Sequence, residues 1–356
     1  MRVIVTGSSG LIGSAAVRHY DALGDEVIGV DNDMRATFFG PQGSTLWNQR
    51  RLEAETTHFR TVVIDIRDRD SILKLFTDSP PDLVIHCAAQ PSHDRAAAIP
   101  FLDFEVNALG TLNLLEATRQ HAPGAVFCHM STNKVYGDAP NELPLVEQDR
   151  RWDYARPADY DGINEQCRID QTMHSLFGAS KTAADVVAQE YGKYFGMSVG
   201  VFRGGCLTGA SHSGVELHGF LSYLVNVAVT GKPYTIFGYK GKQVRDQIEC
   251  SDVVRAFEAF SKKPRPGEVY NIGGGRENAA SVLECIDLIE EISGHRVNWT
   301  LGEENRKGDH ICYISDLSKL RRDYPEWDIR VPLRDILRQM ITAEEERQSA
   351  KPVPSA

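Results

Sequence analysis

Residues 1–14 read MRVIVTGSSGLIGS. The β-branched apolar run predicts a buried strand over residues 2–6, and the small residues after it predict a tight turn into a helix. The glycines Gly7, Gly10 and Gly13 are spaced G-x-x-G-x-x-G, with Leu11 and Ile12 at the start of the predicted helix. Glycines in such a turn let backbone N–H groups approach a pyrophosphate at the positive end of the helix. The stretch therefore predicts a dinucleotide-binding unit.

A second strand is predicted over residues 25–31, and it ends at Asp31, followed by Asn32. Asp31 lies about 18 positions after Gly13, where an acidic side chain can accept hydrogen bonds from an adenosine ribose. A carboxylate there repels a 2′-phosphate, although Arg35 lies nearby. We therefore expect NAD rather than NADP as the cofactor, with Asp31 and Asn32 in contact with it.

The alternation of apolar runs and helical stretches continues along the chain. Runs at residues 60–65, 81–89, 125–131 and 198–205 predict further strands, and near-continuous apolarity is typical of strands covered on both faces. We expect an α/β fold with a Rossmann-like, doubly wound parallel sheet and a smaller, mainly helical C-terminal lobe that binds the substrate. The expected division is 1–203 for the NAD-binding domain, to which later segments return, 204–345 for the lobe, and 346–356 for a frayed tail.

Two stretches are longer than ordinary connections, at roughly residues 33–60 and 138–176. Long loops in compact folds are usually functional or disordered. The second stretch is interpreted either as a cover over the site or as a solvated excursion.

Composition excludes several classes of protein. Of 356 residues, 42% are hydrophobic and 25% are charged, and the formal net charge of -10 disfavours binding to nucleic acid or to an anionic membrane. There is no signal-peptide pattern and no apolar run of the ~18 residues that span a bilayer. The seven cysteines are scattered without a Cys-x-x-Cys pair, which predicts no metal site and fits a reducing cytoplasm. An anionic ligand must therefore be held by local arginines.

Further motifs follow the glycine turn in a definite order. They are Asp65-Ile66, Cys87-Ala88-Ala89, Asn107 within VNALGTLNLLEA, and STNKVYGD at 131–138. With these motifs the chain resembles the extended short-chain dehydrogenase family of nucleotide-sugar epimerases and dehydratases. The STNKVYGD segment, the insert containing DGINE and GKQVRD at 241–246 resemble the CDP-paratose 2-epimerase subfamily.

The resemblance implies roles for particular residues. Asp65 and Ile66 would flank the adenine, Lys181 would hold the nicotinamide ribose, and the remaining cofactor contacts would include Ala88, Ala89, Gln90 and Asn107. Thr132 would hydrogen-bond the reacting sugar hydroxyl. The substrate, a CDP- or UDP-linked sugar, would be held by Thr132, Asn133, Cys206, Arg245 and Arg306. The resemblance also implies a homodimer that associates through two helices of each subunit.

The chain departs from the family at the catalytic position. The family motif is Tyr-x-x-x-Lys, but residues 177–181 read Phe-Gly-Ala-Ser-Lys. Phe177 cannot exchange the proton that the tyrosine removes from a sugar hydroxyl. Residues 177 and 181 still lie one helical turn apart, so the scaffold is retained without its base.

Three explanations of Phe177 stay open. In the first, another group acts as the base. His93 is the first choice, because the ordinary pKa of imidazole is near neutrality. The other candidates are His174, Cys206, and Thr132 acting through a water molecule. The phenylalanine could be an introduced substitution, or the protein could bind NAD without turnover. Leu176, where the family commonly has proline, favours a natural phenylalanine.

The expected activity is NAD-dependent epimerisation of a nucleotide sugar by transient oxidation and re-reduction. A dehydratase is the related alternative, but dehydratases of this family carry Asp-Glu where this chain has Asn133 and Lys134. A noncatalytic NAD-binding protein is the alternative from another class.

Overall fold

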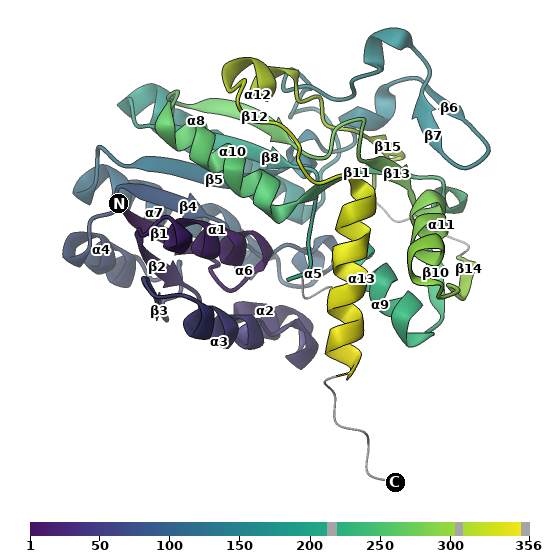
Figure 1. Ribbon diagram of the computed structural model, residues 1–356. Helices are drawn as coiled ribbons and strands as arrows, with labels where there is room; N and C mark the ends of the chain where they lie inside the picture. Colours follow the sequence, from purple (N-terminus) through teal and green to yellow (C-terminus); the bar gives the residue numbers. More distant parts are fainter. Residues whose placement is uncertain (212–218, 303–308, 350–356) are drawn as a thin grey trace.

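The protein is described here by a computed structural model, which covers residues 1–211, 219–302 and 309–349. Its centre is a parallel sheet of seven strands in the order β12-β8-β5-β4-β1-β2-β3 (Figure 1). From β1 the chain builds outward to one edge, and it then returns to build the other half from β4, which confirms the expected doubly wound fold. The strands are β1 (Arg2–Thr6), β2 (Glu26–Val30), β3 (Phe59–Val62), β4 (Leu83–His86), β5 (Val126–Thr132), β8 (Val199–Gly204) and β12 (Glu268–Ile272).

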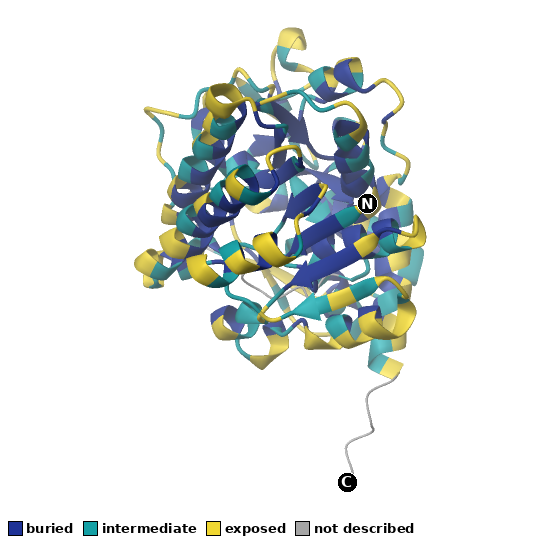
Figure 2. Cartoon of the chain, turned by 90° about the vertical axis from the view of Figure 1, so that its left-hand side faces the viewer, coloured by how far each residue is buried: buried dark blue, intermediate teal, exposed yellow. Residues whose placement is uncertain are grey.

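Helices cover both faces of this sheet, so its central strands are buried on both sides, whereas no residue of the edge strand β3 is fully buried (Figure 2). Along β1, Val3 and Val5 belong to one core layer and Ile4 to the other. Burying an aliphatic side chain of this size contributes about 1.5–3 kcal/mol. One layer is completed by α1 (Leu11–Ala22), α10 (Cys250–Lys262) and α12 (Ser318–Asp323), and the other by α4 (Arg69–Asp78), α7 (Gly110–His121) and α8 (Leu176–Phe195).

The C-terminal lobe has its own core between helices and short strands, at one side of the molecule in Figure 1. Its helices are α9 (Phe220–Thr230), α11 (Val282–Ser293) and α13 (Leu333–Ser349). Its strands are β9 (Cys206–Thr208), β10 (Tyr234–Ile236), β11 (Val244–Glu249), β13 (Ala279–Ser281), β14 (Trp299–Leu301) and β15 (Cys312–Tyr313). Three later elements, α10, β12 and α12, return to the main sheet, while the proposed domain boundaries stay a prediction.

The long stretch at 33–60 is largely helical. It contains α2 (Met34–Phe39) and α3 (Leu46–Glu55) before β3 begins. The Asp33 carboxylate accepts hydrogen bonds from the Thr45 N–H group at 2.8 Å and from the Ser44 hydroxyl at 2.8 Å. This side chain therefore ties the start of α2 to the start of α3, a link that local sequence patterns do not reveal.

The stretch at 138–176 is neither a solvated excursion nor a wall of the cavity described below. It forms the hairpin β6 (Leu145–Glu147) and β7 (Trp152–Tyr154) and packs on the C-terminal lobe. Tyr154 and Ile163 are buried, and the Glu165 carboxylate accepts the N–H of Asn271 at 2.7 Å. The polar composition of the segment concealed these anchoring contacts.

The prediction of a frayed tail from residue 346 onward is wrong for residues 346–349, which the structure describes. Residues 346–349 continue α13, and the Arg347 guanidinium donates to the Ala210 carbonyl at 2.8 Å and lies 5.6 Å from the Trp47 ring centroid. These contacts with distant segments hold the last turns of the helix. Residues 350–356 lie outside the described part of the chain. None of the described helices has both the length and the apolar character needed to cross a bilayer.

Helix α8 carries a lysine into the interior. The helix begins after Ser175, whose hydroxyl accepts the N–H of Gly178, and Lys181 follows one turn later. The Lys181 side chain is 3% exposed, and its Nζ atom donates to the Met130 carbonyl at 2.9 Å. Burial lowers the pKa of Lys181 to about 8, against the opposing influence of the Asp185 carboxylate.

This burial predicts a specific pH dependence of stability. Between pH 8 and about 10.4 the folded protein holds Lys181 as a neutral amine, whereas the unfolded chain still binds the proton. Unfolding free energy measured with urea should therefore increase, relative to that of a Lys181→Met variant, between about pH 7.5 and about pH 9.5. A difference that stays constant over this range would contradict the lowered pKa.

Candidate functional site

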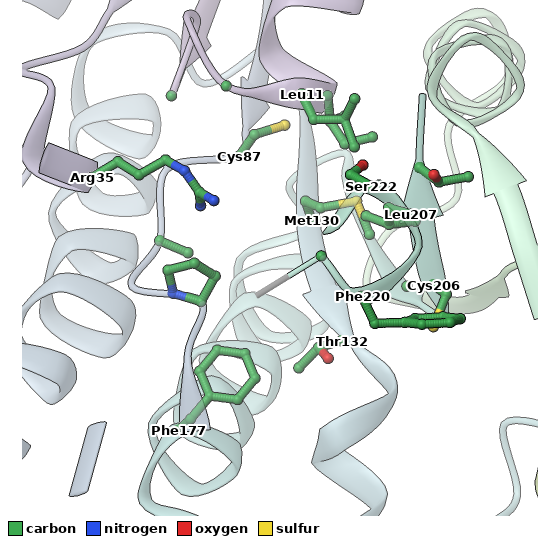
Figure 3. A pocket seen from close by; sticks show the side chains of 18 of the residues that line it. Leu11, Arg35, Cys87, Met130, Thr132, Phe177, Cys206, Leu207, Phe220 and Ser222 are labelled. Carbon is green, nitrogen blue, oxygen red and sulfur yellow. The ribbon is translucent and has the colours of Figure 1, made fainter. Parts of the chain in front are cut away.

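A cavity of about 520 Å³ lies between the sheet and the C-terminal lobe. Figure 3 shows Arg35 extended into it from α2, with Thr132 and Phe177 near one end and Phe220 and Cys206 on the side away from Arg35. Most of the predicted site residues contribute to its wall. They are Gly7, Gly10, Leu11, Ile12, Gly13, Asp31, Asn32, Asp65, Ile66, Ala88, Ala89, His93, Thr132, Asn133, Phe177, Lys181, Cys206 and Arg245. Arg306 lies outside the described residues.

The glycine turn forms an anion cradle in this wall. Gly7 has a φ of +67°, and a Cβ atom there would lie 2.9 Å from the Ala88 nitrogen. A Cβ atom at Gly13 would lie 2.0 Å from the Gly7 carbonyl oxygen. Only glycine therefore permits so close an approach of α1 to the end of β1. No side chain caps the N-terminus of α1, which leaves its first N–H groups for an anionic ligand. The cradle therefore fits a dinucleotide pyrophosphate.

Two carboxylates border the predicted adenosine region. The Asp31 carboxylate accepts hydrogen bonds from the N–H groups of Ser9 and Asp33, each at 2.9 Å, which orients it at the end of β2. Burial disfavours the Asp65 carboxylate, but hydrogen bonds from Arg67 outweigh this, and the pKa of Asp65 lies below its usual value. Asp65 is therefore a charged acceptor at neutral pH.

A buried chain of hydrogen bonds positions Ala88. The Thr111 hydroxyl donates to the Asn107 carbonyl at 2.6 Å, so it must accept from Nε2 of His86 at 2.9 Å. Burial lowers the pKa of His86 to about 3, so Nδ1 is unprotonated and accepts from the Thr6 hydroxyl at 2.7 Å. The Thr6 oxygen in turn accepts the N–H of Ala88 at 3.2 Å. The donor and acceptor of each of these hydrogen bonds are thus determined. The hydrogen bonds link β1, β4 and α7 behind the cavity.

Gln90 and Asn107 do not line the cavity, in contrast to their expected contact with the cofactor. The N–H of Gln90 donates to the side-chain oxygen of Asn107 at 2.9 Å, and the Asn107 amide donates to the Gln90 carbonyl at 3.1 Å. The amides of both residues also donate to Asp103, which accepts the Ser180 hydroxyl beside Lys181. These side chains hold the loop after β4 against α8 from behind.

Thr132 and Phe177 face the cavity near the predicted position of the reacting sugar. The Thr132 oxygen accepts the N–H of Lys134 at 3.2 Å, and its hydroxyl donates a long hydrogen bond of 3.5 Å to the side-chain oxygen of Asn133. The Phe177 ring lies with its centroid 5.0 Å from that of His93, which begins the short helix α5 (His93–Ala98). An imidazole therefore stands beside the ring that replaces the expected tyrosine.

Two of the other candidate bases are disfavoured by their surroundings. His174 does not line the cavity, and its ring nitrogens lie 2.8 Å from the Val135 carbonyl and 3.2 Å from the Thr172 carbonyl. Cys206 lines the cavity, but burial raises the pKa of its thiol to about 12. A neutral thiol is a poor proton acceptor near neutral pH. Among the described candidates, His93 and Thr132 remain.

A cluster of charges lines the part of the cavity formed by the C-terminal lobe. The Arg245 guanidinium donates to Asp309 at 2.5 Å, and the Lys134 ammonium lies 3.7 Å from the same carboxylate oxygen. Burial disfavours the Asp309 carboxylate, but the charges of Arg245 and Lys134 outweigh this and hold its pKa far below its usual value. Two cations and one anion leave a net positive charge, as a diphosphate site requires.

Sequence reasoning missed several residues of this wall. Lys134 lies within the STNKVYGD segment and Asp309 lies three residues after Arg306, but neither was assigned a binding role. Gln243 and Gln247 alternate with Arg245, and a period of two on a strand could have revealed them. The aromatic side chains Tyr234 and Phe237 also line the cavity, and only the tertiary contacts of the lobe bring them there.

Comparison with known proteins gives a consistent result. A family profile described as the NAD dependent epimerase/dehydratase family matches residues 3–273. The chain is 30% identical to CDP-paratose 2-epimerase from Salmonella typhi over 347 residues, which cover 96% of this chain and 98% of that protein. It is 29% identical to dTDP-glucose 4,6-dehydratase 1 from Escherichia coli K12, over 89% of this chain and 82% of that protein.

A solved structure extends the comparison to three dimensions. UDP-glucose-4-epimerase from Stenotrophomonas maltophila, with bound NAD and formylated UDP-arabinopyranose, superposes with a TM-score of 0.80 at 25% identity, covering 99% of this chain and 100% of that one. Together with the family match, this supports NAD as the cofactor. The chain belongs to the NAD dependent epimerase/dehydratase family.

Proposed function

We propose that this protein is a nucleotide-sugar epimerase with an activity like that of CDP-paratose 2-epimerase. The observation that carries the proposal is the continuity of the cavity from the glycine cradle, past Thr132 and Phe177, to Arg245. A dinucleotide and a nucleotide sugar would thus meet in one continuous cavity. When bound, NAD would supply reversible hydride acceptance, so that the sugar would be epimerised without net oxidation.

The residues of the chain have distinct tasks in this proposal. The cradle at Gly7, Gly10 and Gly13 binds the cofactor pyrophosphate, and Asp31 accepts from the adenosine ribose. Lys181, buried one helical turn from Phe177, holds the nicotinamide ribose. Thr132 donates its hydroxyl proton to the substrate in place of the long hydrogen bond, 3.5 Å, that it makes to the side-chain oxygen of Asn133.

His93 is the proposed general base. It lines the cavity against Phe177, and imidazole ordinarily accepts a proton near neutral pH. This assignment follows from the missing tyrosine hydroxyl, since neither Phe177 nor a neutral Cys206 can remove the proton of a sugar hydroxyl.

Two alternatives are kept for specific reasons. A dehydratase is supported by the Escherichia coli relative, but Asn133 and Lys134 stand where the family resemblance places the acidic pair of dehydratases. A noncatalytic NAD-binding protein is supported by Phe177 itself.

The first prediction concerns the product. Purified protein incubated with candidate CDP- and UDP-sugars should form the epimer of one of them, detected by NMR. In deuterated water the inverted carbon should remain free of deuterium, because a hydride that leaves and returns does not exchange with solvent. Formation of a product lighter by one water would instead identify a dehydratase, and no product from any sugar would argue against turnover.

The second prediction concerns the base. Replacing His93 with Asn should lower kcat by about 10²–10⁴-fold without releasing NAD, because only the proton acceptor is lost. A Phe177→Tyr variant serves as the matched comparison and should change kcat by less than about tenfold. If the tyrosine greatly increased turnover while the His93 variant kept the native rate, the disabled-site alternative would be correct.

We also propose a homodimer through α7 and α8, next to the short helix α6 (Pro100–Phe104). Helices α6, α7 and α8 pack together, and their outer faces expose Phe101, Phe104, Leu112 and Val186. The Phe101 side chain is 86% exposed, which is costly for a large aromatic group unless a second copy covers it.

A single substitution tests this interface. Phe101→Glu should shift the protein from dimer to monomer in light scattering at micromolar concentration, because a charge would be buried in the apolar contact. Val63→Glu, at another exposed apolar position, should leave the dimer intact. A native protein that is monomeric would refute the proposal directly.

A further inference from the structure

A contact between α13 and α3 joins the two halves of the molecule beside the cavity. The Arg347 guanidinium donates to the Ala210 carbonyl at 2.8 Å and lies 5.6 Å from the centroid of the Trp47 ring. Arg347 belongs to α13, which packs in the core of the C-terminal lobe, whereas α3 contributes Leu52 to the core of the main sheet. In Figure 1 the C-terminal end of α13 points toward the side of the molecule that carries α2 and α3. The contact therefore links elements that pack in different cores.

Both partners of Arg347 stand next to residues of the cavity wall. Thr45, two residues before Trp47, lines the cavity from the side of α3. Thr208 and Ser211, on either side of Ala210, line it from the lobe. Arg347, Trp47 and Ala210 do not themselves contribute to the wall. The contact therefore bridges two sides of the cavity from outside the space that a ligand would fill.

On the lobe side, Arg347 is anchored to a helix that also forms part of the wall. The Glu344 carboxylate, in a residue only 5% exposed, accepts from Arg347 at 2.8 Å. The same carboxylate accepts from the Asn226 amide of α9 at 2.6 Å. Since the first residues of α9, Phe220 to Tyr223, line the cavity, Arg347 is held in a fixed position relative to this wall.

On the other side, the first turn of α3 is anchored to the glycine cradle. The Asn48 side chain is fully buried, and its amide donates to the Ser9 carbonyl in the glycine turn at 2.9 Å. Asp33, which accepts the N–H of Thr45, donates its own N–H to Asp31. Trp47 is therefore carried on a segment that is tied to both predicted ends of the adenosine-pyrophosphate region.

We propose that Arg347, Trp47 and Ala210 form a clasp that must open before NAD can enter or leave the cavity. The clasp joins the cofactor cradle to the lobe that faces it, so separation of these walls requires that its contacts break. Arg347 and Trp47 are partly exposed, and cation–π contacts at such positions are weak. The clasp therefore slows exchange of the cofactor without preventing it. This proposal rests on NAD as the cofactor and not on the sugar or on epimerisation.

The kinetics of NAD exchange test the clasp. Holoprotein carrying labelled NAD is mixed with excess unlabelled NAD to give the dissociation rate constant, and equilibrium dialysis of the same protein gives Kd. Arg347→Met, which keeps the length of the side chain, should raise both the dissociation and the association rate constants by about tenfold. Kd should change by less than about twofold, because the clasp does not line the space that NAD would occupy.

A double-variant cycle identifies the partner. Trp47→Ala should accelerate exchange like Arg347→Met, and the double variant should be no faster than the faster single variant, because both substitutions break one contact. Two matched controls should exchange NAD at the native rate. Arg338→Met removes an exposed guanidinium of α13 that pairs with Asp335, and Trp299→Ala removes an indole of similar exposure from the lobe.

Two results would overturn the clasp. The first is a native exchange rate in the Arg347→Met variant. The second is faster dissociation without faster association, because a weakened Kd would show that the contact only stabilises the bound state. Loss of folding stability alone cannot imitate the expected result, since a destabilised protein does not bind NAD faster. Absence of epimerase activity would leave these rates unaffected, so the two proposals fail separately.

Discussion

The close backbone contact between β1 and α1 is the constraint on which the site depends. A Cβ atom at Gly13 would lie 2.0 Å from the Gly7 carbonyl oxygen, and one at Gly7 would meet the backbone after β4. Because no side chain intervenes, the uncapped end of α1 lies directly in the cavity wall. The same contact is at the point where the sheet order reverses between β1 and β4, and ligands of open α/β sheets bind at such points.

Local charge, rather than net charge, defines this cavity. The chain carries a formal charge of -10, yet Lys181, Lys134, Arg245 and Arg35 line one internal space. Burial disfavours the charged form of each of these side chains, and it lowers the pKa of Arg35 to about 10. At Arg245 and Lys134, the negative charge of Asp309 opposes this effect of burial. An anionic ligand would compensate the remaining charge, so the acidic net charge of the chain does not oppose the cofactor or the nucleotide sugar of the proposed function.

Phe177 illustrates how a scaffold can persist after its reactive group is gone. Ser175 caps α8, and the helix sets residues 177 and 181 on one face whatever the side chain at 177. The aromatic ring keeps its volume and packs against His93. A buried ion pair behind the site, in which Arg203 donates to Asp185 at 2.8 and 3.0 Å, further fixes α8 against β8. The geometry of this part of the cavity is thus set without a tyrosine hydroxyl at position 177.

The parts of this protein that could be predicted from sequence are those with a local physical cause. The glycine spacing, the apolar strands, Asp31 after β2 and the one-turn separation of Phe177 and Lys181 all follow from backbone geometry within a few residues. Other features needed the folded chain. Gln90 and Asn107 turned out to act from behind the wall, the hairpin at 138–176 packed on the lobe, and Gln247 and Asp309 reached the cavity. These depend on contacts between segments far apart in sequence, because burial and partnering of a polar group are properties of its surroundings and not of its neighbours along the chain.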